Sequence, residues 1–91
     1  MKLHLDTSVG KKAKASLLDD GKVIDSAISR SPLISIDRLL KKHKLKIENI
    51  EDIDYNQGPG SFTGLRVGAA VVNTLNFALG HKVKPKELRY E

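Results

Sequence analysis

The sequence of 91 residues contains no cysteine. Disulfides and thiolate metal sites are therefore excluded, which argues against the disulfide-stabilised secreted class and fits a reducing compartment. The chain shows neither an apolar signal-peptide core nor an apolar run of the roughly 18 residues that a membrane span needs. We therefore expect a cytoplasmic protein that makes no membrane contact.

Aromatic residues are also scarce: tryptophan is absent, and phenylalanine and tyrosine occur twice each. The net charge of +5 would suit a role close to RNA. The basic clusters at 41–46 and 82–86, however, are not interleaved with aromatic side chains, as a base-stacking platform requires. Solvated surface charge is the favoured interpretation, and direct RNA binding through these two clusters remains the alternative.

Hydrophobic alternation predicts three strands in the first third of the chain, over residues 2–6, 12–18 and 22–29. The Asp-Asp-Gly turn at 19–21 joins the second and third strands as an antiparallel pair. Ile24 and Ile28 are the expected apolar anchors of the third strand. A fourth, short strand is expected near residues 52–56.

Two helices follow from capping signals and periodicity. Ser31 and Pro32 begin the first, whose predicted apolar stripe comprises Leu33, Ile36, Leu39, Leu40 and His43. The second covers about 63–79 and ends at Gly80. The order β-β-β-α-β-α predicts an α/β domain with a mixed sheet over residues 1–83. Residues 84–91 form a charged tail, and the segment near Val83 either adds an edge strand or stays disordered.

The second helix is apolar on more than its sheet-facing side. The side chains expected to face the sheet are Leu65, Gly68, Val71, Val72, Leu75 and Leu79. Ala70 and Phe77 fall on the opposite side, with Arg66 and Asn73 as hydrogen-bonding groups. On the first helix, Ile34 lies in the same way beside the polar residues Asp37, Arg38 and Lys41. These eight residues are the candidate partner interface, because aromatics and arginine are enriched at such surfaces. The alternative is that the tail or the first helix covers Phe77.

Two polar segments are weaker candidates for an anion or phosphate site. The first is Asp6, Thr7 and Ser8 after the first strand; the second is the loop of Gly58, Gly60 and Ser61 before the second helix. The loop lacks the Walker A and Rossmann patterns. Tight turning and close packing of Gly64 and Gly68 against the sheet are the favoured explanation. No catalytic set, metal site or cofactor site is predicted, so a non-enzymatic protein is expected.

The segment from Gly58 to Gly68, GPGSFTGLRVG, together with Leu5-Asp6-Thr7-Ser8, strongly resembles the bacterial TsaB (YeaZ) family. The eleven-residue loop is specific, and the order of elements agrees over about residues 2–83. The resemblance implies the actin-like, or ribonuclease-H-like, fold. It also implies a non-catalytic subunit that docks a TsaD-type threonylcarbamoyl transferase and takes part in t6A modification of tRNA.

By the same resemblance, the two helices pair with TsaD or with a second copy, the ATPase TsaE is a further subunit, and tRNA is contacted indirectly. Members of the family are more than twice this length and have a second lobe, so a single lobe offers at most half of a nucleotide site. The catalytic relatives use a pair of histidines on a helix of this lobe. His4, His43 and His81 do not form such a pair, so the resemblance carries no metal catalysis over.

Overall fold

The computed structural model describes residues 1–81 and 87–89 of the chain. The predicted edge strand near Val83 lies outside the described residues, as does most of the predicted tail. Among the tail residues that are described, Leu88 packs against the hydrophobic core and the Arg89 amide donates to the Gln57 carbonyl oxygen at 2.6 Å. This part of the chain therefore lies beside the carboxyl end of the fourth strand.

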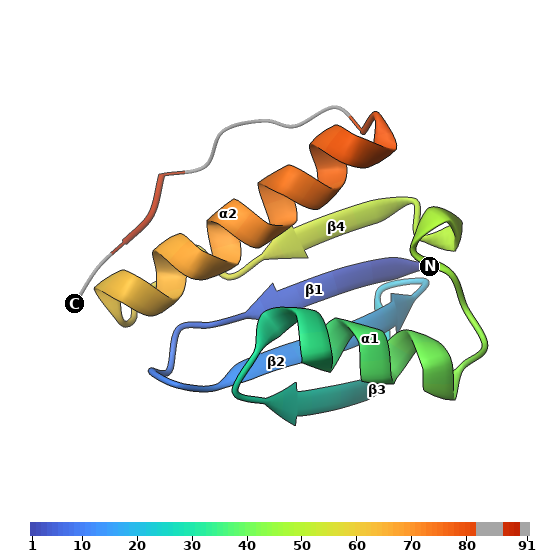
Figure 1. Ribbon diagram of the computed structural model, residues 1–91, viewed down its shortest axis with the longest axis horizontal. Coiled ribbons are helices and arrows are strands. Elements are labelled where there is room, and N and C mark those ends of the chain that lie inside the picture. Colours follow the sequence, from blue (N-terminus) through green and yellow to red (C-terminus); the bar gives the residue numbers. More distant parts are fainter. Residues whose placement is uncertain (82–86, 90–91) are drawn as a thin grey trace.

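A four-stranded mixed sheet forms the base of the molecule (Figure 1). Its strands are β1 (Lys2–Asp6), β2 (Ala13–Asp19), β3 (Lys22–Ser29) and β4 (Asp52–Tyr55), in the order β3-β2-β1-β4. The first three strands pair antiparallel, and β4 pairs parallel with β1. The predicted strands and the predicted mixed sheet are thus confirmed, with boundaries shifted by at most one residue.

The helices are α1 (Pro32–Lys42) and α2 (Phe62–Leu79), with a single 3-10 turn, η1 (Ile47–Asn49), before β4. The Ser31 hydroxyl accepts a hydrogen bond from the Ile34 amide, which confirms the predicted cap of α1. Gly80 ends α2 in the left-handed conformation at φ 75°, as a C-terminal glycine commonly does. Within the described part of the chain, no helix combines the length and apolarity that membrane crossing requires.

Both helices pack on the same face of the sheet. Leu3 pairs with Leu17 on one side and Ile53 on the other, and cross-strand partners point to the same face. These three residues belong to one buried cluster with Leu39 of α1 and Val72 of α2. Figure 1 shows α1 over the β2–β3 side and α2 over the β4 side, running in the same general direction. One core therefore lies between a single sheet face and two helices.

The opposite face of the sheet carries no helix among the described residues, and this corrects part of the sequence prediction. Ile24 and Ile28, predicted as apolar anchors, are 45% and 59% exposed. Ile28 pairs with Lys14 and so shares the uncovered face, whereas Ala27 is the side chain of β3 that packs on the core. Leu33, predicted in the inward stripe of α1, is likewise exposed, because the inward side of this turn is taken by Ser35 and Ile36.

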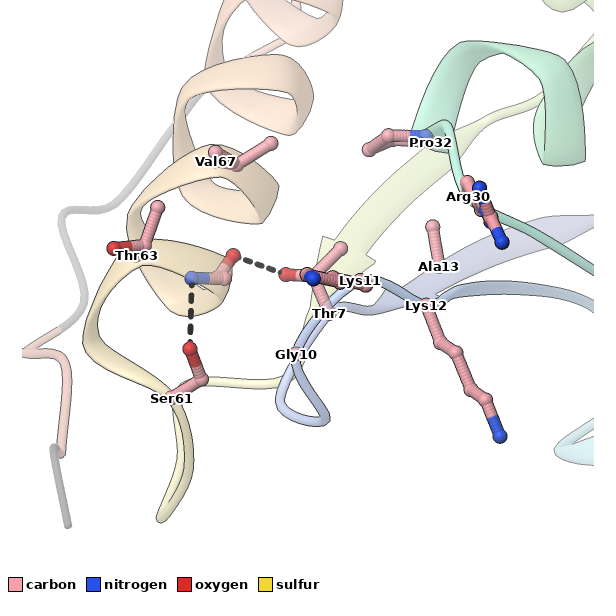
Figure 2. Close-up of a pocket in the computed structure, with 11 residues that line it drawn as sticks. Thr7, Gly10, Lys11, Lys12, Ala13, Arg30, Pro32, Ser61, Thr63 and Val67 are labelled. Carbon is pink, nitrogen blue, oxygen red and sulfur yellow. Dashed lines mark hydrogen bonds between the residues drawn. The ribbon is translucent and has the colours of Figure 1, made fainter.

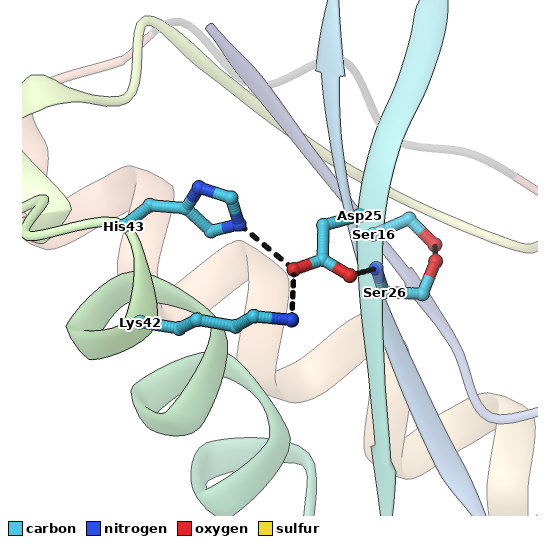
Figure 3. Close-up of polar contacts among 5 residues, drawn as sticks. All are labelled: Ser16, Asp25, Ser26, Lys42 and His43. Carbon is cyan, nitrogen blue, oxygen red and sulfur yellow. Dashed lines mark hydrogen bonds and ion pairs between the residues drawn. The ribbon is translucent and has the colours of Figure 1, made fainter.

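An ionic cluster ties the end of α1 to β3 (Figure 3). One oxygen of Asp25 lies 2.8 Å from His43 Nε2 and 2.9 Å from Lys42 Nζ, and the other accepts a hydrogen bond from the Ser26 amide. These contacts, that of Lys42 first, hold the pKa of Asp25 far below its ordinary value. His43, predicted as part of the apolar stripe, is instead half-buried and bound to this carboxylate.

We expect Asp25→Asn to lower the free energy of unfolding at pH 7, because the charged form of Asp25 is favoured by the fold. A depressed carboxyl pKa gives stability that is complete above the ordinary Asp pKa of about 3.9 and is lost as the pH falls toward the folded-state value. The gap between the wild type and the variant should therefore close below about pH 4 in urea unfolding. Asp37→Asn, at an exposed i,i+4 pair with Lys41, is the control and should change little. A gap that stays constant down to pH 2 would contradict this assignment.

Candidate functional site

The carboxyl end of β1 carries a closed polar network. Oδ1 of Asp6 accepts hydrogen bonds from the Ser8 amide at 2.9 Å, the Ser8 hydroxyl at 2.6 Å and the Asn56 side-chain amide at 3.2 Å. Burial alone raises the pKa of Asp6, but the bonds from Ser8 and Asn56 and the charge of His4 outweigh it and lower that pKa. Asp6 is therefore an ionised carboxylate whose bonds fix the turn after β1.

Thr7 determines how closely α2 approaches the sheet. It is buried, and its hydroxyl donates to the Gly64 carbonyl oxygen at 2.5 Å (Figure 2). A Cβ atom on Gly64 would collide with the Thr7 carbonyl oxygen, and one on Gly68 would collide with the Thr7 hydroxyl. The predicted close packing of these two glycines is confirmed, since only hydrogen at both positions leaves room for Thr7.

The structure brings all six weak anion-site candidates to this end of the sheet. Gly60 sits against Ser8, the Ser61 amide donates to the Ser8 carbonyl oxygen at 2.8 Å, and the Gly58 amide donates to Asn56 Oδ1 at 3.0 Å. Gly58 also has a positive φ and lies against the Arg89 backbone. These contacts account for the glycines as packing residues. Anion binding by this set remains a prediction; Asn56, which bonds both Asp6 and the Gly58 amide, was not predicted.

A half-open cavity of about 470 Å3 lies beside this network, between the turn after β1 and the first turns of both helices. Its lining residues include the hydroxyl-bearing Thr7, Ser61 and Thr63 and the apolar Pro32 and Val67. Lys11, Lys12 and Arg30 are also among its lining residues, and Figure 2 shows the Lys12 side chain extending away from the cavity. These three cations were not predicted as site residues, because they come from segments about twenty positions apart in the chain.

On α1, the four candidate interface residues all point away from the core. Ile34 is 48% exposed, and Asp37, Arg38 and Lys41 are exposed as well. Lys41 and Asp37 form a surface ion pair at 3.0 Å. Leu33, which was assigned to the core, also lies in water and adds a second apolar group beside Ile34.

On α2, Phe77 is 85% exposed and Ala70 is also exposed. Arg66 is exposed, and its guanidinium lies over the Phe62 ring at 5.4 Å from the centroid. Asn73 is half-buried, and its Oδ1 is enclosed without a hydrogen-bond partner among the described residues. Val67, 42% exposed, was not predicted. We call five exposed apolar residues of the two helices the outer strip: Leu33, Ile34, Val67, Ala70 and Phe77; Phe62 at the start of α2 is also exposed, at 54%.

Within residues 1–81 and 87–89, no three side chains of the metal-binding types gather closely enough to hold an ion. The charged cluster of Asp25, Lys42 and His43 lies at the carboxyl-terminal end of α1, whereas the cavity lies at its start, and the cluster joins α1 to β3. The arrangement at the end of β1 is accordingly one of hydrogen-bonded turns and cations around a cavity.

Comparison with known families and curated proteins gives consistent matches. The family model described as "TsaD: tRNA N6-adenosine threonylcarbamoyltransferase" matches residues 26–85. The tRNA threonylcarbamoyladenosine biosynthesis protein TsaB of Haemophilus influenzae is 38% identical over 50 residues, which is 55% of this chain and 21% of that protein. The uncharacterized MG208 homolog of Mycoplasma pneumoniae is 44% identical over 39 residues, which is 43% of this chain and 20% of that protein.

Solved structures confirm the predicted actin-like α/β fold. YeaZ from Pseudomonas aeruginosa superposes with a TM-score of 0.78 at 29% identity, over 94% of this chain and 43% of that one. A second structure is that of an uncharacterized protein with similarity to peptidase YeaZ from the same organism. It superposes with a TM-score of 0.75 at 28% identity, over 99% of this chain and 42% of that one. The chain thus spans less than half of these structures and about a fifth of the curated relatives.

We expect Gly68→Ala to destabilise the protein by about 1–3 kcal/mol, because its methyl group would push Thr7 away from the Gly64 carbonyl. Urea unfolding measures this change. Gly10→Ala is the matched control: a Cβ atom there meets nothing within 4 Å, so it should change the free energy of unfolding by less than about 0.5 kcal/mol. Equal effects of the two substitutions would show that contact with Thr7 is not what requires a glycine at 68.

Proposed function

The chain belongs to the family of the TsaD tRNA N6-adenosine threonylcarbamoyltransferases, among its TsaB and YeaZ members, and from this membership we propose that it is a non-catalytic subunit in t6A modification of tRNA. Its role is to dock a TsaD-type transferase through the outer strip on α1 and α2. TsaE is a further subunit of the same proposed assembly, and the proposed place of action is the cytoplasm.

The observation that carries this proposal is the exposure of the outer strip. A helix normally places its apolar residues on one stripe against the core and its polar residues in water. In α2, Leu65 and Val72 are fully buried, yet Phe77 on the other side is 85% exposed. Ile34 and Leu33 repeat this pattern on α1. Apolar side chains gathered on two neighbouring helices favour burial against another protein, because removing them from water is worth about 25 cal/mol per Å2.

The chemistry of the surface suits a helical partner. Ala70 is small and lets a second helix approach α2, and Phe77 is the kind of aromatic anchor that dominates binding energy at interfaces. Arg66 supplies a charged group on α2, and the paired Asp37 and Lys41 supply charged groups on α1. A polar rim around an apolar centre is the usual composition of a specific interface.

A non-catalytic role is supported by how the polar groups near β1 are used. Asp6 accepts three internal hydrogen bonds, and the Thr7 hydroxyl is bound to the Gly64 carbonyl oxygen. Groups held in this way fix the turn and the seat of α2, and they do not present a base beside a nucleophile as acid–base catalysis requires.

We expect Phe77→Asp to weaken binding to a TsaD-type transferase by at least about thirtyfold, since it places a charge at the centre of the proposed interface. Isothermal titration calorimetry of the two purified proteins measures this loss. Because Phe77 is mostly in water, the free energy of unfolding of the variant should stay within about 0.5 kcal/mol of the wild type.

Val23→Asp is the matched control, because it replaces an equally apolar, 60% exposed residue on the uncovered sheet face. It should leave the affinity unchanged. Sizing of the chain alone and with the transferase separates docking from self-association. A homodimer broken by Phe77→Asp, with no complex at any concentration, would assign the strip to a second copy and overturn the proposed partner.

A further inference from the structure

Three lysines from the β1–β2 turn and the start of β2 meet an arginine from beyond the end of β3 at one corner of the sheet. The antiparallel register pairs Ala13 of β2 with Ser29 of β3. The residues just outside this pair, Lys12 and Arg30, are therefore neighbours across the sheet edge. Lys11 precedes them in the turn, and Lys14 lies on the uncovered face opposite Ile28. We call Lys11, Lys12, Lys14 and Arg30 the basic corner.

The basic corner surrounds three adjoining hollows. The largest is the 470 Å3 cavity between the turn after β1 and the helix starts. A second, of about 350 Å3, lies between that turn and the end of β3, and a third, of about 190 Å3, lies beside Ile28 on the uncovered face. Lys12 borders all three, and Arg30 borders two. The three hollows share these cations as lining residues, and we refer to them together as the groove.

These cations are not neutralised within the described part of the chain. None of the four forms an ion pair there, in contrast to Lys41 and Lys42. The acidic side chain that lines the groove is Asp6; it is ionised and lies opposite Lys14 in the β1–β2 register, but it forms no ion pair with the four cations in the described part of the chain. The Ser61 hydroxyl accepts from the Gly64 amide, so its proton remains available to a ligand in the largest cavity. The groove therefore offers positive charge and hydroxyl donors.

We propose that the basic corner binds the phosphodiester backbone of tRNA. Several unpaired cations spread over adjoining hollows match a ligand with repeated negative charges better than one enclosed anion, and phosphate contacts by Lys and Arg supply most of the affinity of such binding. The inference goes beyond the proposed function, because it gives this chain its own contact with the nucleic acid. The choice of tRNA over other polyanions rests on the proposed function. The position of the binding surface is argued from the structure alone.

The test measures binding of the full chain to an unmodified tRNA transcript by fluorescence anisotropy at several salt concentrations. The variant K11Q/K12Q/R30Q should bind at least about tenfold more weakly at 0.1 M salt. Its log–log salt slope should be shallower by about three, one for each lost phosphate contact. The three side chains are exposed, and the free energy of unfolding of the variant shows that it remains folded.

K22Q/K44Q/K46Q is the matched control, because it removes the same net charge from exposed lysines at the start of β3 and beyond the end of α1. Its affinity for tRNA should stay within about threefold of the wild type, since charges more than about 10 Å from the bound phosphates are largely screened. Phe77→Ala should bind tRNA normally while losing the transferase, which separates this proposal from the docking proposal. Equal losses in the two triple variants, absence of tRNA binding, or binding of free ATP at the corner without tRNA would each overturn the inference.

Discussion

The seating of α2 on Thr7 is the contact on which the rest of the arrangement depends. Gly64 and Gly68 let the helix touch the end of β1, and the hydrogen bond from Thr7 to the Gly64 carbonyl fixes that contact. With the start of α2 held there, Leu65 and Val72 are directed into the core and Phe77 is directed away from it. The same contact places Ser61 and Val67 at the wall of the cavity that faces Arg30. The orientation of α2 and one wall of the cavity therefore follow from this glycine–threonine junction, whereas the basic corner follows from the register between β2 and β3.

The sheet covers only part of the apolar surface of α1 and α2, and the rest of that surface is exposed to water. Only one face of the sheet carries helices among the described residues, and each helix contributes just one side to it. Two apolar areas therefore stay exposed: the outer strip, and the uncovered sheet face that carries Ile28. They differ in character, because the outer strip combines an aromatic residue with a charged rim, whereas Ile28 lies among Lys12 and Lys14. The first composition is suited to a protein partner, and the second borders a surface suited to a polyanion.

Much of the fold was predictable because its signals are local. Alternation gave β1 and β3, the Ser31–Pro32 cap gave the start of α1, and Gly80 gave the end of α2. Periodicity identifies the face on which a residue lies but not whether another element covers that face, so Ile24, Ile28 and Leu33 were wrongly assigned to the core. The exposure of Phe77 was predictable from α2 alone. The basic corner was not, because only the pairing of Ala13 with Ser29 brings Lys12 to Arg30.

Amide hydrogen exchange of the chain, alone and bound to a TsaD-type transferase, tests the central claim most directly. If the outer strip is the docking surface, complex formation should slow exchange in peptides from Pro32–Lys42 and Phe62–Leu79, while peptides from β3 keep their free-state rates. Protection confined to β3 and the uncovered sheet face, with both helices unchanged, would contradict the account.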